Sequence, residues 1–291
     1  MEIEISDGMK ETDIINYIKK FNIEDEDAAY IRNNEYFCFT TDGLVFSTDV
    51  PEEMDPETAG RKSVIMNLSD LAAMGSRPLL FLCSLNIPRT FLDVKKIIDG
   101  IYHECEKYNI KYAGGDINEG ELSITGFAVG KTKRILKRNT AKENDLVCIT
   151  GDLGRVYCYF KGMKIDIFKE KVFYPIPRIK EGEILSNYAN ACIDISDGAS
   201  KELNLISELS NVKIELETLP IHPSVLKIAK ERAFDYALNS GEEFELIFTI
   251  SKKYSSIIEK VNATVVGRVR SGEGVFYKGK KIERGGWEHF D

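Results

Sequence analysis

The order of strand-like and helix-like segments constrains the fold of this 291-residue chain more than any other feature. In the first half, the aromatic and β-branched residues of 35–50 predict one or two strands. A helix is predicted to begin after the N-cap Asp55, with Pro56 in its first turn, and to end near Met74 before Gly75. The pattern then predicts a strand over 78–88, an amphipathic helix over 92–108, and two strands over 110–116 and 121–132. A short amphipathic helix is also predicted over 10–21.

The second half repeats the theme after a polar, basic stretch at 131–145. Strands are predicted over 146–151, 191–196, 212–217, 243–250 and 263–270, with helices over 177–189, 198–210, 222–232 and 253–261 between them. This pattern predicts an α+β protein of the α/β sandwich type with two domains, an N-terminal mixed sheet with helices and a C-terminal α/β domain. We place the boundary near Arg138, which gives domains 1–138 and 139–291.

Charge and hydropathy exclude several classes of protein. A net charge of -8 disfavours a broad nucleic-acid surface, which needs clustered Lys and Arg. No stretch approaches the roughly 18 to 20 apolar residues of a membrane span, and the acidic N-terminus lacks the apolar core of a secretory signal. We therefore expect a cytoplasmic protein. If such an acidic chain binds phosphates, a divalent cation held by carboxylates is the obvious way to screen the repulsion.

The cysteines and histidines do not form a recognisable metal or nucleophile motif. The six cysteines are spread singly without a C-x-x-C pair, which favours reduced core residues: Cys38, Cys83, Cys105, Cys148, Cys158 and Cys192. The three histidines lack a matching nucleophile elbow, and the chain has no Walker phosphate loop, dinucleotide fingerprint or protein-kinase signature.

Five short segments place an acidic residue in a tight, Gly- or Ser-rich junction or a helix turn. They are 25–29 (DEDAA), 40–43 (TTDG), 67–75 (NLSDLAAMG), 112–116 (YAGGD) and 193–198 (IDISDG). Carboxylate and hydroxyl oxygens from separate strand ends suit magnesium, and small neighbours let phosphates approach the backbone. Each segment alone is more typical of an Asx turn or a helix cap than of a metal site. Asp70 favours the metal interpretation, because it falls in the middle of an apolar helix, where a carboxylate needs a partner.

Together these segments resemble a known family. NLSDLAAMGSRP, YAGGD, IDISDG, NSGEEFELIFT and the terminal GGWEHF, in this order, are similar to the thiamine-monophosphate kinases of the aminoimidazole ribonucleotide synthetase superfamily. The resemblance runs from about residue 22 to the C-terminus. It implies the last step of thiamine diphosphate biosynthesis, an in-line phosphoryl transfer from ATP to thiamine monophosphate with several Mg²⁺ ions and no phosphoenzyme. It also implies a homodimer that pairs through the N-terminal domains, with ATP and metal bound near that interface.

The resemblance also implies roles for individual residues. The implied metal ligands are Asp27, Thr40, Thr41, Asp42, Asp70, Asp116, Asp194 and Asp197. Of these, Asp42, Asp70 and Asp197 are expected to act at the reacting phosphates. The implied nucleotide contacts are Gly115, Arg138 and Ser196, and the implied substrate contacts are Asp49, Glu242 and Trp287. A cationic thiazolium beside Trp287 and Glu242 is favoured by cation–π and Coulomb attraction.

Two departures from the family pattern keep other interpretations open. The chain has Asp25-Glu26-Asp27 where the family has Gly-Asp-Asp, and Asp49 where it has a substrate-contacting histidine. One alternative is another ATP-using enzyme of the superfamily, although the chain ends in HFD without the C-terminal cysteine of the hydrogenase-maturation dehydratase. The other is a nucleotide-binding regulatory protein that keeps the fold and lacks turnover.

Overall fold

The computed structural model describes residues 14, 18 and 25–288. Apart from Ile14 and Ile18, the helix predicted over 10–21 lies outside these residues. Among the described residues, no helix is long and apolar enough to cross a membrane.

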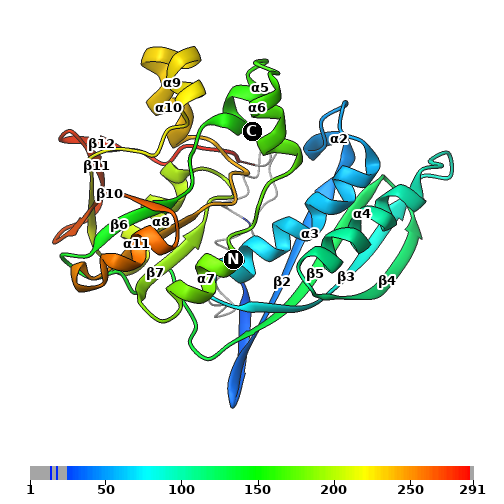
Figure 1. Cartoon of the computed structure of the whole chain (residues 1–291), viewed down its shortest axis with the longest axis horizontal. Helices are drawn as coiled ribbons and strands as arrows, with labels where there is room; N and C mark the ends of the chain where they lie inside the picture. The colour runs from blue at the N-terminus through cyan, green and yellow to red at the C-terminus, as the bar shows by residue number, and fades with distance from the viewer. Residues whose placement is uncertain (1–13, 15–17, 19–24, 289–291) are drawn as a thin grey trace, which may run out of the picture.

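The first half forms a five-stranded mixed sheet in the order β1-β2-β5-β3-β4. Its strands are β1 (Ala29–Asn33), β2 (Glu35–Val45), β3 (Arg77–Ile87), β4 (Lys111–Glu119) and β5 (Ser123–Thr132). Of these strands, β3 and β4 pair in parallel and the other neighbours pair antiparallel. The helices α3 (Pro56–Ala73) and α4 (Val94–Lys107) lie across one face of this sheet (Figure 1). Residues 35–50 form one strand, followed by the short helix α2 (Phe46–Asp49).

The predicted ends of α3 are confirmed in atomic detail. The Asp55 carboxylate accepts hydrogen bonds from the backbone N–H groups of Glu57 and Thr58, which caps the helix start. The helix ends at the C-cap Met74, and Gly75 follows with a left-handed φ of 66°.

The second half forms a seven-stranded mixed sheet in the order β12-β11-β8-β10-β6-β9-β7. Its strands are β6 (Leu146–Thr150), β7 (Ala189–Asp194), β8 (Lys213–Leu216), β9 (Leu246–Ile250), β10 (Ala263–Arg270), β11 (Gly274–Tyr277) and β12 (Lys280–Ile282). Its helices are α5 (Arg155–Phe160), α6 (Asp166–Phe173), α7 (Ile179–Leu185), α8 (Ala199–Ser210), α9 (Pro223–Ala229), α10 (Ala233–Leu238) and α11 (Ser256–Lys260), with short 3₁₀ turns η2 (Lys230–Arg232) and η3 (Lys252–Tyr254). The α+β class with two mixed sheets is confirmed.

Helix α3 joins the two halves. It packs against β2, β3 and β5 on one side and against α7 and β7 of the second half on the other. The approach of α7 is so close that a Cβ on Gly182 would lie 2.1 Å from the carbonyl oxygen of Ala72. One hydrophobic core therefore runs through both halves, and a second core fills the other face of the seven-stranded sheet. The chain crosses between the sheets over residues 133–145, the segment in which we predicted the boundary.

Candidate active site

Four of the predicted metal-ligating aspartates come together where α3 meets β7. Asp27 precedes β1, Asp42 lies on β2, Asp70 on α3, and Asp194 at the end of β7. Burial, followed by the nearby charges of Asp194 and Asp42, raises the pKa of Asp70 well above its ordinary value. Burial and the charge of Asp27 raise the pKa of Asp194 to about 8. The structure thus gathers carboxylates from both halves of the chain at one place.

Hydroxyl groups hold two of these carboxylates in position. Thr40 donates its Oγ1 hydrogen to Oδ2 of Asp70, and Ser69 donates to Oδ2 of Asp194 at 2.5 Å. Thr41 points to the opposite face of β2, where its hydroxyl donates to the carbonyl of Gly126 at 2.9 Å. The side chain of Thr41 therefore lies away from the cluster, unlike those of Thr40 and Asp42.

Arg138 ties the acidic turn at 25–27 to the segment that links the two sheets. Its guanidinium donates to Oδ1 of Asp27 at 2.5 Å and to Oδ1 of Asp25 at 3.3 Å. Its backbone N–H donates to the Glu26 carboxylate at 2.9 Å. The Asp27 side chain is only 1% exposed, so Arg138 supplies the cation that this buried carboxylate requires.

The donor set fits a hard cation, although the carboxylates do not already form a coordination shell. Within the described part of the chain, no three Asp, Glu, His or Cys side chains are arranged to hold a metal. The second oxygen of Asp27, Oδ2, is buried and receives no hydrogen bond from a described donor. Clustered carboxylate oxygens with an unused buried acceptor suit Mg²⁺, whose binding would replace the protons and hydrogen bonds that now neutralise the cluster.

A second group of charged residues adjoins the cluster. Glu242 and Asp49 contribute, after burial, to raising the pKa of Asp42 to about 6. The Asp49 carboxylate accepts from the backbone N–H of Val45 at 2.7 Å and from the Thr48 hydroxyl at 2.8 Å. Glu242 has a left-handed φ of 51°, and its backbone N–H donates to the Ser196 carbonyl at 2.6 Å. Two predicted substrate contacts therefore lie near Asp42.

Lys62 completes this group and was missed in the sequence. Its side chain is 0% exposed, and its Nζ lies 2.7 Å from Oε1 of Glu242 and 3.4 Å from the carbonyl oxygen of Asp49. Lys62 and Ser69 stand seven residues apart on α3, which places them on one face of the helix. This shared face is the only local signal for the two residues, and it does not show that the Lys62 ammonium is buried, which depends on the distant Glu242.

The remaining predicted residues divide between the cluster and the sheet edge. Asp197 binds Lys201 at 2.7 Å, and its carbonyl accepts the backbone N–H of Trp287 at 2.9 Å. The Trp287 side chain is 56% exposed. Gly115 and Asp116 lie on the edge strand β4, where a Cβ on Gly115 would meet the Cys83 carbonyl at 1.7 Å.

Asp116 is not brought beside the four aspartates. Pairing aligns Asp42, Gly126, Cys83 and Gly115 in one row across β2, β5, β3 and β4. With about 4.8 Å between neighbouring strands, the row separates β2 from β4 by roughly 14 Å. The Asp116 carboxylate accepts instead from Asn118 Nδ2 at 2.8 Å.

Comparison with known proteins shows which family the chain belongs to. The family described as "AIR synthase related protein, N-terminal domain" matches residues 25–132. The thiamine-monophosphate kinase of Pyrococcus horikoshii is 44% identical over 97% of this chain and 96% of its own length. The chain belongs to the thiamine-monophosphate kinase family. The resemblance seen in its motifs is therefore confirmed.

Solved structures of thiamine-monophosphate kinases have the same architecture. The structure described as "AaThiL complexed with AMPPCP and TMP" matches with a TM-score of 0.90 and 31% identity, covering 100% of this chain and 99% of that one. The thiamine monophosphate kinase from Aquifex aeolicus matches with a TM-score of 0.86 and 31% identity, over 95% of this chain and 100% of that one. A structure of a HypE–HypF complex, at 20% identity and a TM-score of 0.75, shares the fold alone.

The raised carboxyl pKa values predict how the stability of the metal-free protein depends on pH. Burial raises the pKa of Asp194 and of Glu202 to about 8, from ordinary values of 3.8 and 4.5. Between about pH 4 and pH 8 the folded chain therefore holds protons that the unfolded chain has released. The free energy of unfolding should fall as the pH rises through this window, as measured by urea denaturation in EDTA. Glu202→Gln should make the free energy of unfolding depend less steeply on pH. An equal dependence in the variant and the wild type would contradict the raised pKa of Glu202.

Proposed function

We propose that this protein transfers the γ-phosphoryl group of ATP to the phosphate of thiamine monophosphate, which yields ADP and thiamine diphosphate. The observation that carries the proposal is the full-length similarity to thiamine-monophosphate kinases, one of which is described with an ATP analogue and TMP bound. The cluster of Asp27, Asp42, Asp70 and Asp194 supports the proposal. Phosphoryl transfer from ATP requires metal ions that neutralise the phosphate charges, and carboxylates are the side chains that hold such ions.

The mechanism requires positioning and charge neutralisation more than covalent participation. An oxygen of the substrate phosphate attacks the γ-phosphorus in line, and the bond from that phosphorus to the bridging oxygen of ADP breaks. We assign the neutralising role to Mg²⁺, which when bound screens the phosphate charges. The residues proposed to hold it are Asp27, Thr40, Asp42, Asp70, Asp194 and Asp197, with the backbone of Thr41. Asp116, on the far edge strand β4, is proposed to hold a separate Mg²⁺ ion.

Arg138, Gly115 and Ser196 are proposed to contact the nucleotide. Arg138 now pairs with Asp25 and Asp27, so it is already fixed beside the metal-binding oxygens. Glu242 and Trp287 are proposed to receive the cationic thiazolium by charge attraction and stacking, with Asp49 nearby. The exposure of the Trp287 side chain supports this role, because a substrate ring can reach the indole.

A panel of phosphate acceptors tests the proposal. Purified protein with ATP and Mg²⁺ should form thiamine diphosphate from thiamine monophosphate, and ADP should accumulate in equal amount. ADP release with a different acceptor only would favour another enzyme of the superfamily. Tight ATP binding by calorimetry, without turnover of any acceptor, would favour a regulatory protein.

We also propose a cytoplasmic homodimer. The six cysteines are free and buried, which suits a reducing compartment. The face of the five-stranded sheet opposite α3 and α4 carries a set of large apolar side chains that are only partly buried: Phe37, Phe39, Leu80, Leu82, Phe127 and Val129. A contiguous apolar face of this kind suits a two-fold symmetric contact with a second copy.

Phe39→Asp is expected to convert the dimer to a monomer. Phe39 stands opposite Val129 in the sheet, and its ring centroid lies 6.4 Å from that of Phe127, so a carboxylate there would be buried in the apolar contact. Analytical ultracentrifugation should detect the change. Ile228→Asp, at an exposed position on α9, is the matched control and should stay dimeric. A Phe39→Asp protein of unchanged mass would contradict the proposed interface.

A further inference from the structure

A pocket of about 380 Å³ lies at the end of the seven-stranded sheet away from the aspartate cluster. Asp145 precedes β6 there, Lys253 follows β9, and Asn190 lies near the start of β7. Asp194 of the cluster sits at the other end of β7, so the two sites are separate. None of the residues that line the pocket belongs to the proposed active site.

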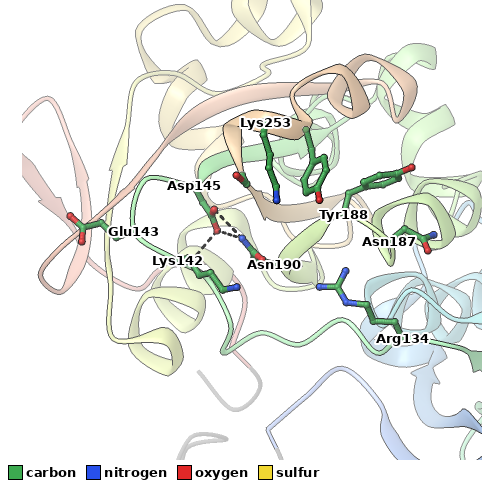
Figure 2. Close-up of a pocket in the computed structure, with 10 residues that line it drawn as sticks. Arg134, Lys142, Glu143, Asp145, Asn187, Tyr188, Asn190 and Lys253 are labelled. Atoms are coloured by element: carbon green, nitrogen blue, oxygen red, sulfur yellow. Dashed lines mark hydrogen bonds between the residues drawn. The ribbon is translucent and has the colours of Figure 1, made fainter.

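Three cationic side chains surround the pocket. Figure 2 shows the ends of Arg134, Lys142 and Lys253 directed toward one space, whereas Glu143 points away from it. Among the described residues, none of these cations has a carboxylate within ion-pair distance, although the protein carries a net charge of -8. The three cations outnumber the one carboxylate that faces the pocket, Asp145, so the pocket has a local positive potential.

Two of the pocket's polar side chains are held by hydrogen bonds before any ligand arrives. Arg134 donates to the carbonyls of Ser186 at 2.8 Å and Ala189 at 2.9 Å, which fixes its guanidinium and leaves its charge uncompensated. The buried Asp145 carboxylate accepts from Asn190 Nδ2 at 3.0 and 2.9 Å and from the backbone N–H of Lys142 at 3.1 Å. The inward-facing carboxylate is therefore already engaged. The Lys253 ammonium lies 4.6 Å from the centroid of the Tyr254 ring, and neither lysine ammonium is paired with a carboxylate among the described residues.

We propose that this pocket binds a small molecule through a phosphate or diphosphate group, with Lys142 and Lys253 as its ligands and Arg134 as a fixed positive charge. A phosphate offers several acceptor oxygens that ammonium groups can share. The pocket volume accommodates a phosphate group with a modest organic part, and the edge-to-face pair of Tyr188 and Tyr254, with ring centroids 5.3 Å apart, provides an aromatic wall for it.

Calorimetric titration of the full-length protein with inorganic diphosphate at low ionic strength tests the proposal. The wild type should show a binding event that the double variant Lys142→Ala/Lys253→Ala weakens by about tenfold, since two charge-assisted contacts are lost. The control Lys227→Ala/Lys260→Ala removes the same charge from exposed sites elsewhere in the second half and should bind as the wild type does.

Kinase assays separate this site from the catalytic one. The Lys142→Ala/Lys253→Ala protein should keep the kcat of the wild type, because neither lysine touches the aspartate cluster. Equal diphosphate binding by the pocket variant and the wild type, or no binding by the wild type, would overturn the proposal. Neither result would alter the proposed kinase function, which is measured in a different assay.

Discussion

Asp70→Asn is expected to lower kcat by about 10²- to 10³-fold while leaving the folded protein as stable as the wild type or more so. The rate and the stability respond differently because burial and the charges of Asp194 and Asp42 raise the pKa of Asp70, so the metal-free protein favours its protonated form. Asparagine has the shape of the protonated acid and can still accept the hydrogen bond from Thr40. It removes a repelled negative charge but cannot neutralise a cation, so binding of Mg²⁺ should weaken and high Mg²⁺ should restore part of the rate.

Steady-state kinetics over a range of Mg²⁺ and thermal unfolding in EDTA are the measurements. Asp99→Asn, on the neighbouring helix α4, makes the same chemical change outside the cluster and should leave kcat unaltered. If Asp70→Asn kept the wild-type kcat at all Mg²⁺ concentrations, Asp70 would be structural and the proposed metal site would be wrong.

Lys62→Met is expected to raise the KM for thiamine monophosphate and to destabilise the protein by about 1–3 kcal/mol, because it leaves the partly buried Glu242 carboxylate without its partner. Its ammonium group is fully buried between Glu242 and the carbonyl of Asp49. Without it the Glu242 carboxylate, which is 29% exposed, loses its cation and is no longer held near Asp42. The KM for ATP should change less, because Lys62 contacts residues assigned to the other substrate.

A double-mutant cycle with Glu242→Gln distinguishes this role from simple packing. If the ion pair is responsible, Lys62→Met should cost about 1–2 kcal/mol less in the Glu242→Gln background than in the wild type. Urea denaturation and the KM for thiamine monophosphate should both show the coupling. Additive effects in the two measurements would mean that Lys62 only fills space.

The sequence predicted the elements with strong local signals and missed those without them. The start and end of α3 follow from Asp55, Pro56 and Gly75, whose effects on the backbone are local. The short strand β1 and the helices α5 and α6 have too few residues to establish a period, and tertiary packing decides their conformation.

The candidate site was predicted where an acidic residue stood out from its surroundings. Asp70 was conspicuous in an apolar helix, whereas Lys62 lies near a helix start, where a lysine is ordinarily solvated. That its ammonium is buried depends on Glu242, 180 residues later, and no local pattern carries that information.

The structure shows what Asp49, the residue that differs from the family's histidine, does in this chain. The sequence placed an acid where the family has a substrate-contacting histidine. In the structure both of its carboxylate oxygens accept hydrogen bonds from within its own turn, and its carbonyl meets Lys62. Asp49 thus shapes the turn that borders the proposed substrate site, and its role as a direct contact stays a prediction.

The position of α3 between the two sheets limits how this enzyme can be divided or recombined. Most of its residues are buried, against β2, β3 and β5 on one side and α7 and β7 on the other. A fragment that ends near residue 138 would leave the α7-facing side of this helix uncovered, so we expect it to aggregate. Exchange of one half between family members would likewise have to preserve the α3–α7 contact, including the glycine at 182. The two halves therefore depend on each other for folding, and neither should be exchanged independently of the other.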